Sequence, residues 1–77
     1  MECFAVLGSG LIKLRHLPNG DVALIYTGSG LVEEVIQEIC KDGRCYRDQA
    51  LRHWVVRSNF LEAAIADLAK RATRLPS

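Results

Sequence analysis

The chain has 77 residues, of which 49% are hydrophobic and 25% are charged. This length predicts a single domain over residues 1–77, and the composition is typical of a folded domain and excludes a disordered chain. The net charge of +1 gives no overall field that would draw the protein to nucleic acid or to an anionic membrane, so any charge that matters must be local. No apolar stretch approaches the roughly 20 residues that span a bilayer, and we expect no membrane partner.

The first half of the chain predicts three strands and a helix. Residues 2–7 are short and apolar and end at a Gly-Ser-Gly sequence, which is typical of an edge strand. Apolar and polar residues alternate over residues 11–17, as in a strand with one face more exposed to water. Asn19-Gly20 is typical of a tight hairpin turn, so residues 22–26 are expected to form the partner strand. Apolar residues in 31–41 recur on one helical face. The opposite face includes three glutamates, Glu33, Glu34 and Glu38.

The second half repeats this order. Residues 44–47 and 52–57 predict two strands around a turn, with Trp54 in the core, and a helix is expected from Ser58 or Asn59 until Pro76 stops it. A ββα unit cannot bury its helix and its sheet face alone, but two such units can. We therefore predict an α+β fold in which two ββα units and an N-terminal edge strand form one mostly antiparallel sheet with both helices on one face.

The cysteines and histidines do not form a recognisable catalytic or metal site. Three cysteines do not suit a disulfide framework, so reduced thiols and a cytoplasmic location are expected. Cys40 and Cys45, with His53 further on, lack the two tight pairs of a structural zinc site. Cys45 and His53 would need an orienting group and an oxyanion donor to act as a nucleophilic pair, and neither is evident. We expect no catalytic residue, no metal and no cofactor, and hence no enzyme.

A local basic cluster is the most informative feature for function. Between residues 41 and 57, five basic residues stand against two acids, which gives a local charge of +3 before His53 is counted. Tyr46, His53 and Trp54 are interleaved with them. Arginines beside aromatic rings suit single-stranded nucleic acid, because guanidinium groups bind phosphates and bases stack on rings. The candidate binding residues are Lys41, Arg44, Arg47, Arg52 and Arg57.

Residues 22–70 also resemble the HARP-type domain, an accessory module of annealing helicases with related modules in bacterial and phage proteins. The likeness consists of an apolar strand ending in Tyr26, a helix, the Arg44-Cys-Tyr-Arg-Asp48 segment, a basic residue before Trp54, and a second helix. Tyr46, Arg52 and Trp54 carry the match, although Arg47 stands between the Tyr and Asp that are adjacent in the family pattern. The resemblance implies a non-catalytic module that binds branched or single-stranded DNA.

Two functions therefore remain open from the sequence. The first is a non-enzymatic binding module that acts on nucleic acid or on a protein of a nucleic-acid-handling complex. The second is a small inhibitor of the kind found in mobile genetic elements and phages, such as the anti-CRISPR proteins, which blocks a partner protein. In that case Glu33, Glu34 and Glu38 would mimic phosphate for a basic target, or residues 2–7 would offer an open strand edge. Homodimerisation through that first strand would also suit so thin a core.

Overall fold

The computed structural model describes residues 2–28, 30–50 and 53–76. It is an α+β fold with one antiparallel sheet of strand order β4-β5-β3-β2-β1-β6. The first three strands, β1 (Glu2–Val6), β2 (Gly10–His16) and β3 (Val22–Gly28), form a meander, and the helix α1 (Gly30–Ile39) follows. The hairpin of β4 (Cys45–Asp48) and β5 (His53–Val56) joins the sheet beside β3, and a 3-10 turn, η1 (Ser58–Phe60), leads into α2 (Leu61–Arg71).

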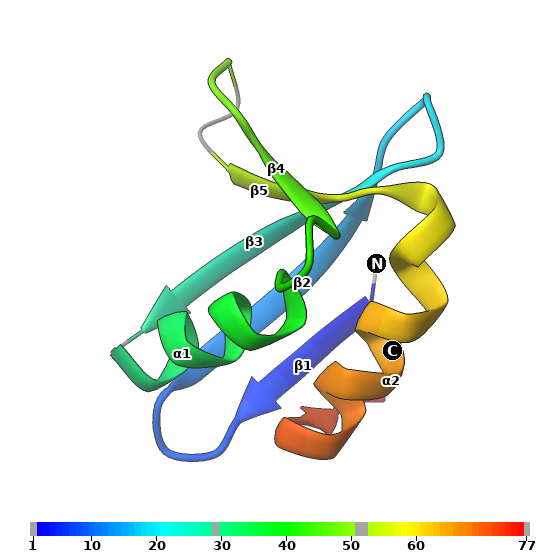
Figure 1. Cartoon of the computed structure of the whole chain (residues 1–77). Helices are drawn as coiled ribbons and strands as arrows, with labels where there is room; N and C mark the ends of the chain where they lie inside the picture. The colour runs from blue at the N-terminus through cyan, green and yellow to red at the C-terminus, as the bar shows by residue number, and fades with distance from the viewer. Residues whose placement is uncertain (1, 29, 51–52, 77) are drawn as a thin grey trace.

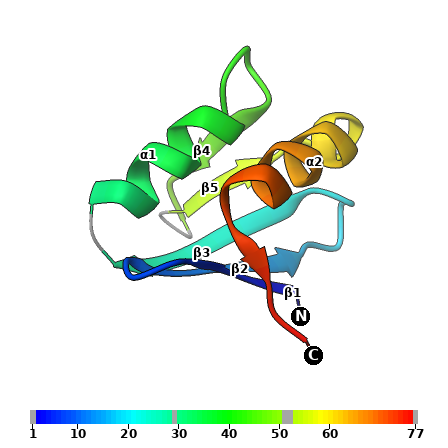
Figure 2. The same ribbon diagram turned by 90° about the horizontal axis from the view of Figure 1, so that it is seen from below.

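Both helices cover the same face of the sheet (Figure 1; Figure 2). The two predicted ββα units are thus confirmed as β2-β3-α1 and β4-β5-α2. The core lies between the helices and the sheet, because alternate strand residues and the apolar helix stripes point into the same layer. Fully buried residues of this layer include Phe4, Ile12, Leu24, Ile36 and Leu68.

Two predicted turns have clear physical causes. In the β2–β3 hairpin, Gly20 adopts a φ of 93°, and Asn19 accepts a hydrogen bond from the backbone N–H of Asp21 at 3.0 Å. At the other end of this hairpin, Gly10 faces Gly28 in the register. A Cβ on either residue would lie about 2 Å from a backbone oxygen of the facing strand, namely 2.0 Å at Gly10 and 2.1 Å at Gly28. Only glycine allows the two backbones to approach in this way.

The two ends of the predicted sheet need correction. The second helix ends at Arg71 rather than near Pro76, because Ala72 adopts an extended backbone and Thr73–Arg74 forms β6. This short strand pairs with Phe4 and Ala5 of β1. Residues 2–7 are therefore not the open edge that the sequence predicted, and the sheet ends instead at β6 and β4.

Candidate nucleic-acid interface

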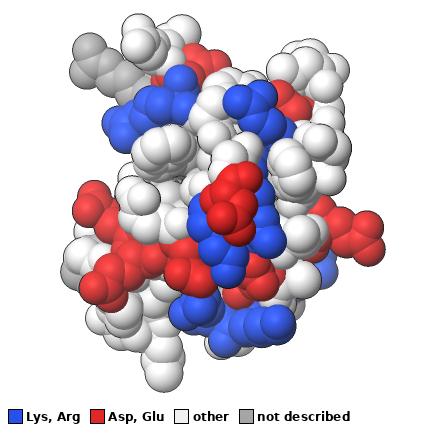
Figure 3. Space-filling model, viewed as in Figure 1, with Lys and Arg blue, Asp and Glu red and all other residues white. Residues whose placement is uncertain are grey.

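The β4–β5 hairpin lies at the centre of the predicted basic cluster: Arg47 belongs to β4, and Arg44 and Arg57 stand directly before β4 and directly after β5. It crosses the upper part of the molecule and extends beyond the helices (Figure 1). Seen from the helix side, basic side chains gather over this hairpin, whereas acidic side chains gather over α1 (Figure 3). Arg52 lies outside the described residues, so the structure locates four of the five predicted cations: Lys41, Arg44, Arg47 and Arg57.

Arg44 has a structural role rather than a free guanidinium. Its Nη1 atom donates to Oδ2 of Asp67 on α2 at 2.6 Å. The side chains of Arg44 and Asp67 are only 18% and 23% exposed, and the hydrogen bond from Arg44 lowers the pKa of Asp67. This contact ties the start of β4 to α2. Arg44 is therefore engaged by Asp67, and its role in binding stays a prediction.

Lys41 is also engaged. Its Nζ donates to Oε1 of Glu38 at 3.1 Å, and Arg71 approaches the same oxygen at 3.3 Å from the end of α2. Both cations lower the pKa of Glu38, with the hydrogen bond from Lys41 as the largest cause. These exposed pairs are weak, since water screens them. Lys41 and Glu38 are nevertheless occupied by each other, whereas Glu33 and Glu34 are exposed on α1 and make no ion pair with a described residue.

Arg47 and Arg57 form the part of the cluster that faces solvent. Both residues are exposed, and neither makes an ion pair with a described residue. The guanidinium of Arg47 lies 5.6 Å from the centroid of the Trp54 ring, and that of Arg57 lies 5.0 Å from the centroid of Tyr46. At these distances the ring quadrupole attracts the cation. Arg57 also donates from Nε to the carbonyl oxygen of Gly43 at 3.3 Å, which fixes its direction.

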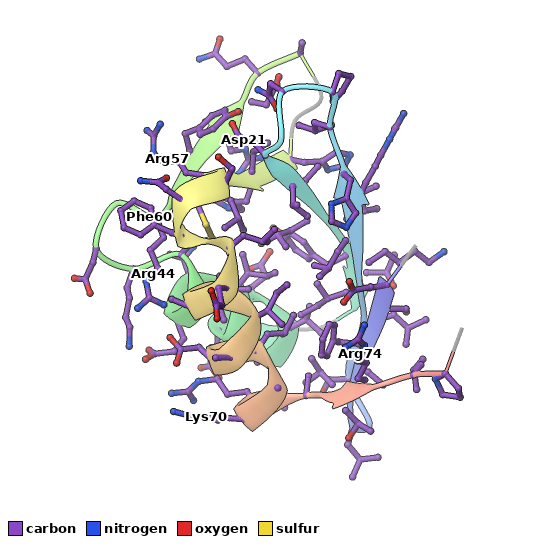
Figure 4. The ribbon with its side chains drawn as sticks, turned by 90° about the vertical axis from the view of Figure 1, so that its right-hand side faces the viewer. Asp21, Arg44, Arg57, Phe60, Lys70 and Arg74 are labelled. Carbon is purple, nitrogen blue, oxygen red and sulfur yellow. A yellow bond between two sulfur atoms is a disulfide. The ribbon has the colours of Figure 1, made fainter. Side chains whose placement is uncertain are left out.

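The hairpin is held against the rest of the fold by Asp21, at the end of the β2–β3 turn. The Tyr46 hydroxyl donates to Oδ2 of Asp21 at 2.8 Å, and the backbone N–H of Ser58 donates to Oδ1 at 2.8 Å. These two hydrogen bonds, with the nearby charge of Arg57, lower the pKa of Asp21. The same bond to Asp21 raises the pKa of Tyr46. Asp21 and Arg57 lie close together near the start of the η1–α2 segment (Figure 4).

A disulfide joins Cys40, just after α1, to Cys45 at the start of β4. The prediction of reduced thiols is therefore wrong for these two residues, and only Cys3 is a free cysteine among the described residues. The sulfur of Cys45 is not a free nucleophile in this state. The argument from reduced thiols to a cytoplasmic location also loses its basis, and that location stays a prediction.

Trp54 is half-buried and packs against the buried core residues, which agrees with its predicted place in the core. The guanidinium of Arg47 lies over its ring. Sequence reasoning missed Asp21 and Asp67, the two carboxylates that organise the cluster. A signal for Asp21 existed in the Asn-Gly-Asp turn, which places a carboxylate at the start of β3. Asp67 gave no local signal, because it meets Arg44 from 23 residues away.

No group of three or more His, Cys, Asp or Glu residues in the described ranges could hold a metal ion. In the same ranges, no helix is long and apolar enough to cross a membrane. Comparisons with models of protein families, with curated proteins and with solved structures find no match for this chain. The resemblance to the HARP-type domain stays a prediction.

Proposed function

We propose that this protein is a non-enzymatic module that binds single-stranded or branched DNA through the β4–β5 hairpin. The observation that supports this most is the pair of exposed arginines, Arg47 and Arg57, each lying over an aromatic ring. A stacked guanidinium keeps its outer N–H groups for phosphate oxygens and offers its own flat face to a base. The hairpin thus combines the two kinds of contact on which binding to single strands depends.

The interface is smaller than the sequence suggested. Arg44 pairs with Asp67 and Lys41 with Glu38, so we propose Arg47 and Arg57 as the main contacts, and Lys41, Arg44 and Arg52 remain candidates from the sequence. Trp54 and Tyr46 supply the aromatic rings over which Arg47 and Arg57, respectively, lie. With so few cations, we expect weak binding with little sequence preference, with a Kd of about 10⁻⁴–10⁻⁶ M at physiological salt, as for other non-specific interactions.

The test is an electrophoretic-mobility titration against single-stranded, duplex and forked DNA at low and physiological salt. We expect the single-stranded and forked forms to bind more tightly than the duplex. Arg47→Ala or Arg57→Ala should weaken binding by about tenfold each, since one stacked contact contributes roughly 1–3 kcal/mol. Arg47→Lys should retain part of the affinity because the charge remains but the flat stacking group is lost. The matched control is Arg15→Ala, an exposed cation of β2 outside the hairpin, which should bind as the wild type does.

A second function, inhibition of a partner protein, is supported by a different observation. Glu33 and Glu34 are exposed on α1 and make no ion pair with a described residue, and the neighbouring Leu31 is 47% exposed. This acidic surface would suit a basic partner. Absence of binding to every DNA form would contradict the first proposal and favour this one. A Glu33→Gln/Glu34→Gln variant that loses an inhibitory effect on a DNA-handling complex would then support it.

A further inference from the structure

The sheet face opposite the helices is uncovered over β1, β2 and β3. Figure 2 shows α1 and α2 on one side of these strands and no described element on the other. Cross-strand neighbours share a face, so the register assigns three rows of side chains to this surface. The first row contains Ala5, Leu11 and Thr27, the second contains Cys3, Lys13 and Ile25, and the third contains Arg15 and Ala23.

The middle of this face is a shallow apolar hollow. It has a volume of about 120 Å³ and is lined by Leu11, Lys13, Ile25 and Thr27. Leu11 is 38% exposed. Leu75 extends the apolar surface at the β6 side, where its backbone N–H donates to the carbonyl oxygen of Cys3 at 2.9 Å, and it is 36% exposed. Leu11, Ile25 and Leu75 therefore offer apolar surface beside Lys13 and Thr27, and its burial by a partner would be favourable.

The charges on this face all have one sign. Lys13 and Arg15 are exposed on β2, and neither makes an ion pair with a described residue. The single acid in the described strands β1, β2 and β3 is Glu2, which faces Leu14 on the helix side and is paired with Arg74 at 3.1 Å. The whole chain outside this face has eight Lys or Arg residues against nine Asp or Glu. Positive charge is thus concentrated beside the hollow.

We propose that this face docks an acidic amphipathic segment of a partner protein. The apolar side chains of that segment would cover Leu11 and Ile25, and its carboxylates would meet Lys13 and Arg15. The four lining residues include no aromatic ring, whereas single-stranded nucleic acid favours aromatic rings on which bases stack, as on the β4–β5 hairpin. A second copy of this chain, docked face to face about a two-fold axis, would bring like charges together. The hollow is lined by residues of β2 and β3, whereas Arg47 and Arg57 lie in and directly after the β4–β5 hairpin, so the two proposed surfaces use different residues.

The probe is a synthetic amphipathic helical peptide made of leucine and glutamate, titrated into the ¹⁵N-labelled full chain and followed by NMR. Its matched control carries lysine in place of every glutamate. We expect chemical-shift changes at open-face residues of β1, β2 and β3 with the glutamate peptide and none with the lysine peptide. Lys13→Glu/Arg15→Glu should weaken binding by about tenfold, because two exposed attractive pairs become repulsive. Lys13→Gln/Arg15→Gln should give a smaller loss, and Leu11→Gln should weaken binding without changing the thermal unfolding midpoint.

Several results would overturn the proposal. One is equal binding of the two peptides, and another is the absence of shift changes at millimolar peptide concentration. Shift changes confined to the helices or to β4–β5 would place the acidic segment elsewhere. Oligothymidylate that shifts the same β1–β3 residues would assign the face to nucleic acid. A concentration-dependent dimer in sedimentation equilibrium, broken by Leu11→Gln, would assign it to a second copy of the chain.

Discussion

Removing the disulfide between Cys40 and Cys45 should destabilise the fold by about 2 kcal/mol. The two cysteines are 5 positions apart, so the bond closes a short loop. In the chain-entropy model, such a loop restricts the unfolded state by about 2 kcal/mol, near the lower end of the usual range. For a chain of this length, that change lowers the unfolding midpoint by roughly 10 °C. The loop also contains Gly43, whose carbonyl oxygen holds Arg57, so DNA binding should weaken as well.

The measurement is urea unfolding of the wild type before and after reduction, with the thiol count from mass spectrometry before each run. A Cys40→Ala/Cys45→Ala variant should resemble the reduced protein and should not respond to reductant. The control is Cys3→Ser, which leaves the disulfide intact and should still lose stability on reduction. Equal stability of the reduced and oxidised wild type would refute this reasoning, as would three free thiols in the untreated protein.

Three further predictions concern the core, the β2–β3 pair and pH. Leu68 is fully buried, so Leu68→Ala should cost about 3 kcal/mol in urea unfolding, whereas Leu31→Ala on the exposed side of α1 should cost less than about 0.5 kcal/mol. Gly10→Ala should lower the thermal midpoint strongly because its Cβ would meet a backbone oxygen at 2.0 Å, whereas Gly30→Ala, which meets nothing within 4 Å, should leave it unchanged. The folded-state pKa of Asp21 is below its ordinary value, so its contribution is present above about pH 4 and is lost as the pH falls through the lowered pKa. Urea unfolding across acidic pH should therefore show a shallower loss of stability for Asp21→Asn than for the wild type; identical slopes would contradict that role.

The sequence predicted those parts of the fold that depend on local patterns. Apolar residues that recur on one helical face of residues 31–41 predicted α1, which ends at Ile39. Alternating apolar and polar residues, with turn residues between the strands, predicted the hairpins. The strand predicted over residues 52–57 is present as β5, in which Val55 and Val56 are 0% and 1% exposed. These patterns are short-range, and no distant residue is needed to recognise them.

The local Cys40–Cys45 disulfide was missed because an odd cysteine count was taken as evidence for reduced thiols, and the other errors came from contacts between distant segments. Strand β6 is only Thr73–Arg74, and it exists because it meets β1, about 70 residues earlier in the chain. Likewise, counting cations between residues 41 and 57 could not show that Arg44 points to Asp67. The charge density therefore predicted the location of a basic hairpin but overestimated how many of its cations face solvent.

The measurement that tests the proposed function most directly is the salt dependence of binding to oligothymidylate. For single strands, the logarithm of the binding constant falls with the logarithm of the salt concentration by about 0.7 per phosphate neutralised. If Arg47 and Arg57 each neutralise one phosphate, Arg47→Ala/Arg57→Ala should reduce the slope by about 1.4. The charge-matched control, Lys13→Ala/Arg15→Ala, should leave the slope as in the wild type. Equal reductions in the two double variants, or no binding by the wild type at low salt, would contradict the account.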